Sequence, residues 1–139
     1  MGWLQSSERK RRVGQQILLD STVVIAALSD TDSHYVNAQE IFSETSRTQI
    51  AVSAVSVGEI LIRPSAAGEE SVELFLSRLD KLIHRIIPFE KDHARLAALI
   101  RAKQKTTFVD SMIISTAILE NRTLISFDRK MMGIYERVK

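Results

Sequence analysis

The 139-residue chain has no cysteine, only two prolines and five glycines, and no hydrophobic run near the roughly 20 residues that span a membrane. The lack of cysteine excludes disulfides and thiolate metal sites, and it is compatible with a reducing compartment. So little proline and glycine argues against linkers and low-complexity segments. The first residues also lack the apolar stretch of a signal peptide. We therefore expect a cytoplasmic protein without membrane association.

Length and composition predict one domain. The chain is long enough to bury a sizeable core and too short for two ordinary domains, and its 45% apolar and 26% charged residues are typical of globular proteins. A basic cluster, Arg9 to Arg12, precedes the first apolar run. We divide the chain into a basic N-terminal extension, residues 1–16, and a folded domain, residues 17–139. The extension could be a solvated charge run, an RNA-contacting arm or a partner-binding element, and a net charge of +2 permits a polyanionic partner without requiring one.

Short apolar runs alternate with longer segments of helical periodicity. The expected strands are 17–19, 50–53, 85–89 and 123–126, with an edge strand at 135–138. The expected helices are one that carries Val23 to Leu28, followed by 34–46, 55–63, 69–82, 92–103 and 111–120, with a helical turn at 129–132. The helix 55–63 should end near Pro64, because proline breaks the helical hydrogen-bond pattern.

Short strands that alternate with long helices need crossover connections, which produce a mostly parallel sheet with helices on both faces. We therefore predict an α/β fold with three layers, α/β/α. In such sheets a site forms beyond the carboxyl ends of the strands, where the strand order reverses. Residues that directly follow a strand are the first candidates.

Three aspartates occupy such positions. Asp20 follows the first strand, Asp128 comes shortly after the fourth, and Asp110 precedes an apolar helix whose inward stripe includes Ile113 and Ile114. Each of the three could instead be an ordinary helix N-cap, for which aspartate is a favoured residue.

Glu59 is the fourth acidic candidate. It shares one stripe of its predicted helix with Val55 and Ile62, which favours an inward position. The alternative is an exposed glutamate that pairs with Arg63 one turn later. If all four carboxylates converge, they repel one another unless protons or a cation neutralise them. Oxygen ligands favour Mg²⁺, or Mn²⁺ as a substitute, and such ions support phosphodiester hydrolysis.

The sequence resembles the PIN-domain nucleases, and among them the single-domain VapC-type toxins of toxin-antitoxin pairs, over about residues 17–138. The resemblance depends on the segments ILLDSTVVIAAL, SAVSVGEIL, FVDSMIISTAI and LISFDRKM, which contain the four acids in order. It implies a PIN-like fold and a Mg²⁺-dependent endoribonuclease that binds RNA, a cognate antitoxin and a second copy of itself. It also implies catalytic and metal-binding roles for Asp20, Glu59, Asp110 and Asp128. Ser21 and Ser126 would support them, with Ser126 orienting the fourth acid.

Two other functions fit the same pattern. A phosphoacceptor receiver domain also places acids at strand ends, but it needs paired acids after the first strand, and Asp20 has no acidic neighbour. A catalytically silent PIN-like module would keep the fold and act through protein contacts alone. The three histidines, His34, His84 and His93, have no ligand-like spacing and are expected at the surface or an interface, so neither a zinc site nor a Ser-His-Asp triad is indicated.

Overall fold

The computed structural model describes residues 14–139, so most of the basic extension, including Arg9 to Arg12, lies outside the described residues. The described chain forms four strands and seven helices. The strands are β1 (Ile17–Leu19), β2 (Ile50–Ser53), β3 (Arg85–Ile87) and β4 (Thr123–Ile125). The helices are α2 (Ser21–Leu28), α3 (Tyr35–Glu44), α4 (Ala54–Ala67), α5 (Glu69–Leu82), α6 (Lys91–Lys103), α7 (Phe108–Leu119) and α8 (Arg129–Val138), with a 3₁₀ turn, η1, at Arg47–Gln49.

The strands form one sheet in the order β3-β2-β1-β4, and every pairing is parallel. The chain moves outward from β1 through β2 to β3 and then returns to place β4 on the other side of β1. The strand order therefore reverses at β1 and β4, which makes their carboxyl ends the expected position of a site.

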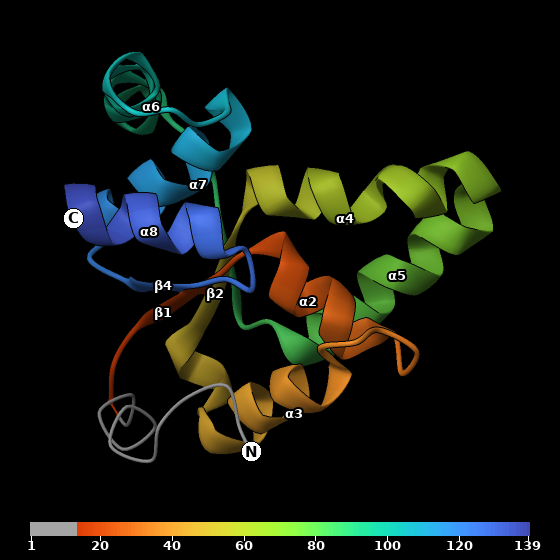
Figure 1. Cartoon of the computed structure of the whole chain (residues 1–139). Helices are drawn as coiled ribbons and strands as arrows, with labels where there is room; N and C mark the ends of the chain where they lie inside the picture. Colours follow the sequence, from red (N-terminus) through yellow and green to blue (C-terminus); the bar gives the residue numbers. More distant parts are fainter. Residues whose placement is uncertain (1–13) are drawn as a thin grey trace.

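Helices cover both faces of the sheet, as predicted (Figure 1). On one face, Ile17 and Leu19 pack with α2, α3 and α5 and with Ile60 of α4. On the other face, Leu18 packs with α6, α7 and α8. Because successive side chains of a strand point to opposite faces, these few apolar strand residues serve both cores. In Figure 1, α4 and α5 extend as a pair beyond the sheet on the right.

Some predicted boundaries were wrong. The helix α4 continues through Pro64 to Ala67. Proline removes only its own backbone N–H from the helical pattern. Its carbonyl still accepts a hydrogen bond from Gly68 N at 3.1 Å. Strand β3 ends at Ile87, before Pro88. The segment 135–138 is not an edge strand but the end of α8, because Met131, Ile134 and Tyr135 form one buried helical stripe.

Within residues 14–139, no helix is both long enough and apolar enough to cross a bilayer.

Candidate functional site

The four predicted acids reach the carboxyl edge of the sheet from four different helices. Asp20 follows β1 and is the N-cap of α2, and Asp128 follows β4 and is the N-cap of α8. Glu59 lies in the second turn of α4, and Asp110 lies in the first turn of α7. The parallel pairing of β1 and β4 sets Leu19 beside Ile125, so the residues that follow these strands are neighbours.

Electrostatic coupling joins the four carboxylates. Burial is the largest cause that raises the pKa of Glu59 above its ordinary value, and the charges of Asp20 and Asp110 raise it further. The pKa of Asp110 is also raised. Burial is the largest cause, and the charges of Asp128 and Asp20 follow. In both side chains the negatively charged form is therefore less favourable than in water.

Asp20 is held by hydroxyl groups at the base of the site. Its side chain is 2% exposed, and Oδ2 accepts hydrogen bonds from Ser126 Oγ at 2.7 Å and Thr22 Oγ1 at 2.8 Å. Each hydroxyl has a single proton and gives it to Asp20, so the 3.3 Å approach of the two hydroxyl oxygens is a contact and not a further hydrogen bond. The network fixes one carboxylate oxygen and leaves Oδ1 with only a long, 3.5 Å contact to Ser21 Oγ.

Ser21 lies between Asp20 and Glu59. Its hydroxyl hydrogen-bonds to Glu59, which lowers the pKa of that carboxyl against the effect of burial. The same hydroxyl is 3.5 Å from Asp20 Oδ1, at the limit for a hydrogen bond. Oε1 of Glu59 is buried and has no hydrogen-bond partner. A buried carboxylate oxygen without a donor is costly, so this atom has capacity for a ligand.

Ser126 acts on the first acid rather than on the side chain of the fourth. Its Oγ donates to Asp20 and accepts from the backbone N–H of Asp128 at 3.0 Å. The side chain of Asp128 is oriented by its own helix, because Oδ1 accepts from Lys130 N at 3.0 Å and Met131 N at 3.1 Å. Ser126 therefore connects Asp20 with the backbone at Asp128.

The capping alternative applies to two of the three aspartates. Asp20 and Asp128 cap helices, and each still lies beside the other acids. Asp110 is not a cap, because α7 begins at Phe108 and Thr107 is the N-cap, with its Oγ1 accepting from Asp110 N at 3.1 Å. The prediction that this helix begins at Ser111 was wrong by three residues.

Glu59 faces the acids, although part of the reasoning for its position fails. Ile62, expected on an inward stripe, is 67% exposed. In the described part of the chain no ion pair joins Glu59 to Arg63, and Glu59 is instead coupled to Asp20 and Asp110.

The described residues include no group of three acidic or histidine side chains close enough to surround one metal ion. The acids therefore form an open arrangement, and a cation here would need other ligands, such as water, to complete its shell.

The histidines differ from one another. His34 and His84 are exposed, as expected. The surface prediction is wrong for His93, which is 4% exposed and connects α6 to the end of α7. Its Nδ1 accepts from Glu90 N at 2.9 Å, so the proton is on Nε2 and is donated to Glu120 at 2.9 Å.

Sequence reasoning missed two residues of the site. Thr22 donates to Asp20 and accepts from Phe127 N at 3.1 Å, and its place two residues after an N-cap aspartate was the available signal. Lys130 lowers the pKa of Asp110 through its positive charge, and only its position after Asp128 could have indicated this.

The fold and the site define an α/β/α protein with an acidic site at the switch point of a parallel sheet. The PIN domain family model matches residues 17–136, and the chain belongs to this family, whose members are nucleases. A comparison with curated proteins gave no match.

Several solved structures are similar to this chain in fold. VapC20 of Mycobacterium tuberculosis, a Sarcin-Ricin loop cleaving toxin, has a TM-score of 0.70 and 15% identity, covering 85% of this chain and 94% of its own. FitAcB from Neisseria gonorrhoeae has a TM-score of 0.71 and 20% identity, with coverages of 87% and 94%. VapBC2 from Rickettsia felis, bound to a promoter DNA fragment, has a TM-score of 0.64 and 22% identity, with coverages of 86% and 92%.

Proposed function

We propose that this chain is a Mg²⁺-dependent endoribonuclease that acts as the toxin of a toxin-antitoxin pair. One observation carries the proposal: Asp20, Glu59, Asp110 and Asp128 gather at the switch point of a PIN domain, where Asp20 and Asp110 act on Glu59, and Asp20 and Asp128 act on Asp110. Membership of a nuclease family supports phosphodiester chemistry, and the RNA-cleaving toxin of similar fold supports RNA as substrate.

The donor set fits Mg²⁺, with Mn²⁺ as a substitute, because it consists of oxygens. Glu59 Oε1 has no hydrogen-bond partner, and Asp20 Oδ1 keeps free lone pairs. Asp20 and Glu59 would contact the ion directly, and Asp110 and Asp128 would add negative charge nearby, because no three of these side chains are close enough to surround one ion. The open arrangement is compatible with this assignment, since Mg²⁺ keeps several waters and often binds one or two carboxylates together with substrate phosphate.

Bound Mg²⁺ would supply an activated water and charge stabilisation at the phosphate. The chain itself contributes position and charge. Ser126 and Thr22 fix Asp20 on the rigid end of β1, so the carboxylate needs no reorganisation when substrate binds. Lys130 places a positive charge beside the acids, where it would attract the RNA phosphate and counter its repulsion by the carboxylates.

Two protein partners belong to the proposal: a cognate antitoxin and a second copy of this chain. Similar structures include toxin-antitoxin complexes, among them one from Klebsiella pneumoniae with a TM-score of 0.71. A hollow of about 490 Å³ between α2, α4 and α5, with Ile25, Ile60 and Phe75 in its lining, has Glu59 on its wall. An apolar antitoxin segment in this hollow would lie against the acidic site. Light scattering of the purified chain, alone and with its antitoxin, tests both partners.

The test of activity is cleavage of total RNA by the antitoxin-free protein with Mg²⁺, with Mn²⁺ and with chelator. We expect cleavage only with metal, and a loss of at least 100-fold in Asp110→Asn, roughly the range for removing a key electrostatic group. Asp80→Asn makes the same chemical change on the exposed side of α5 and should cleave like the parent. Cleavage with chelator, or full activity of Asp110→Asn in preparations free of contaminating nuclease, contradicts the mechanism. A parent that cleaves no RNA would favour the silent module.

A further inference from the structure

Two aromatic rings from distant parts of the sequence stack beside the acidic site. The ring of His34, at the N-cap of α3, lies 4.6 Å from the ring of Phe127, centroid to centroid, with 20° between the planes. Phe127 stands between Ser126 and Asp128, so the pair borders the residues that hold the acids. His34 is exposed although Phe127 covers one of its faces, so the other face is accessible.

The pair lines a shallow hollow of about 290 Å³ that also includes Thr22, Ile25, Asp32 and Asp128. Thr22 and Asp128 belong to the acidic site, so the hollow is continuous with it. Its volume falls just below the roughly 300–1,000 Å³ of pockets that enclose a whole ligand. It is therefore suited to one part of a larger molecule.

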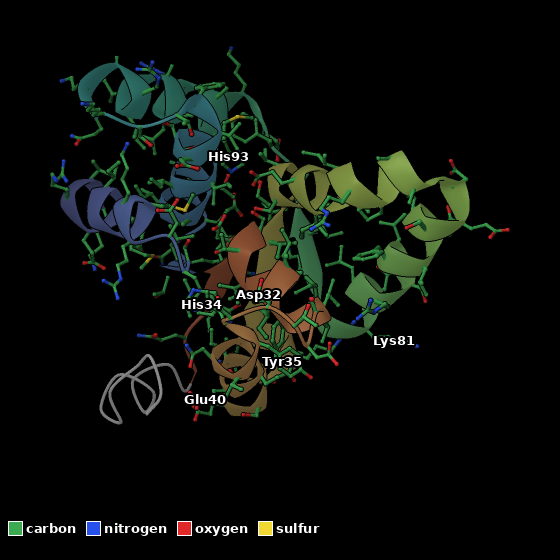
Figure 2. The ribbon with its side chains drawn as sticks, turned by 45° about the vertical axis from the view of Figure 1, so that its right-hand side comes forward. Asp32, His34, Tyr35, Glu40, Lys81 and His93 are labelled. Atoms are coloured by element: carbon green, nitrogen blue, oxygen red, sulfur yellow. The ribbon has the colours of Figure 1, made fainter. Side chains whose placement is uncertain are left out.

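Backbone contacts hold His34 in place. Asp32 Oδ1 accepts from His34 N at 2.8 Å, and the carbonyl of Asp32 accepts from Tyr35 N at 3.0 Å. Figure 2 shows Asp32 and His34 on the same side of the molecule, just before α3. The ring is thus presented from a fixed turn and not from the end of a free loop.

We propose that this hollow binds one unpaired base of the RNA, which stacks on the open face of His34 beside the phosphate at the acidic site. The inference rests on the proposed function and adds the residue that positions the substrate strand. Proteins recognise single-stranded RNA by stacking its bases on aromatic side chains, including histidine, with little dependence on base identity. The walls contain the carboxylates of Asp32 and Asp128, which repel phosphate, so the uncharged base is the part of a nucleotide that fits.

The test uses a short single-stranded oligoribonucleotide with one 2-aminopurine, a base whose fluorescence falls when it stacks. It is titrated with Mg²⁺ into the full chain carrying Asp110→Asn, so that the strand binds without being cut. Three further changes are compared in this protein: His34→Ala, His34→Phe and His84→Ala. His84 is an exposed histidine outside the hollow and provides the matched control.

We expect His34→Ala to weaken binding roughly 5- to 150-fold, which corresponds to 1–3 kcal/mol per stacked base, and to abolish the quenching. His34→Phe should keep both, because its phenyl ring also offers an aromatic face for stacking and lacks only the hydrogen-bonding nitrogens of imidazole. His84→Ala should leave both unchanged. Unaltered binding and quenching in His34→Ala overturns the inference, and so does a His34→Phe variant that behaves like His34→Ala.

Cleavage by the chain without the Asp110→Asn change separates this inference from the proposed function. If that chain cleaves RNA while His34→Ala binds normally, the base site is wrong and the nuclease stands. If it does not cleave while the stacking pattern holds, the nuclease is wrong and the base site stands.

Discussion

The four acidic residues of the site differ in how their carboxylates are held. Hydroxyl groups fix Asp20, and two backbone N–H groups fix Asp128. Glu59 and Asp110 instead have pKa values raised by burial and by neighbouring carboxylates. The first two residues therefore contribute to the fold as well as to the site, whereas burial and neighbouring carboxylates make the charged forms of the last two less favourable.

At the same residue scale, Asp110→Asn should leave the melting temperature of the metal-free protein unchanged or raise it. Asparagine keeps the shape of the side chain and removes the charge that Asp128 and Asp20 repel. The stabilisation that Mg²⁺ gives should be smaller in this variant than in the parent. In the parent, Mg²⁺ at 100 times its Kd should raise the free energy of unfolding by about 2.7 kcal/mol. Thermal unfolding with chelator and with Mg²⁺ measures both effects, with Asp80→Asn as control. A clear fall in the metal-free melting temperature would show that the charge stabilises the fold.

A second residue-scale prediction concerns Ser126, which is 6% exposed. Ser126→Ala removes one of the two hydroxyl donors to Asp20 Oδ2 and the acceptor for Asp128 N. We expect a loss of about 1–3 kcal/mol in the free energy of unfolding, because buried polar groups lose their partners. RNA cleavage should fall as well, since Asp20 is no longer fixed. Urea denaturation compares the variant with Ser77→Ala on the exposed surface of α5, and equal stability of the two variants would refute this role for Ser126.

At the scale of elements, the joint between α4 and α5 depends on one residue. Gly68 ends α4 and begins α5 with φ 121° and ψ 172°, a conformation that L side chains rarely adopt. A Cβ at Gly68 would meet no atom within 4 Å, so backbone conformation alone requires glycine there. The conformation of Gly68 determines the direction in which α5 leaves α4. The helix α4 carries Glu59.

Gly68→Ala should therefore destabilise the protein by about 1–3 kcal/mol through backbone strain. Gly133→Ala is the matched change within α8, where a Cβ also meets nothing within 4 Å and φ is ordinary. It should stabilise the protein by about 0.5–1 kcal/mol, because alanine is the better helix former. Chemical denaturation of the two variants measures effects of opposite sign. A neutral Gly68→Ala would mean that the joint relaxes at little cost.

At the scale of the whole molecule, the two helical layers pack on opposite faces of the same strands, which are only three or four residues long. Ile17 and Leu19 belong to one core and Leu18 to the other. The acidic site lies where both layers meet the carboxyl edge of the sheet, with α2 and α4 on one side and α7 and α8 on the other (Figure 1). The site therefore exists only when both layers are folded onto the sheet, because neither layer supplies all four acids.

The sequence by itself determined the elements and the candidate acids. Local patterns are sufficient for this, because a run such as Ile17–Leu19 ended by Asp20 has few alternatives to a buried strand followed by a capped helix. The same local reasoning failed at Pro64 and at the end of α8, where packing against the rest of the molecule outweighs the propensity of single residues.

Only the tertiary structure decided how these residues meet. The order β3-β2-β1-β4 brings Ser126 to Asp20 across more than one hundred residues of chain and leaves Glu59 Oε1 without a partner. It also stacks His34 on Phe127, two residues that no spacing in the sequence connects. Periodicity reports which face of an element is buried, whereas contacts between elements depend on strand order and on the packing of both layers, which local sequence does not encode.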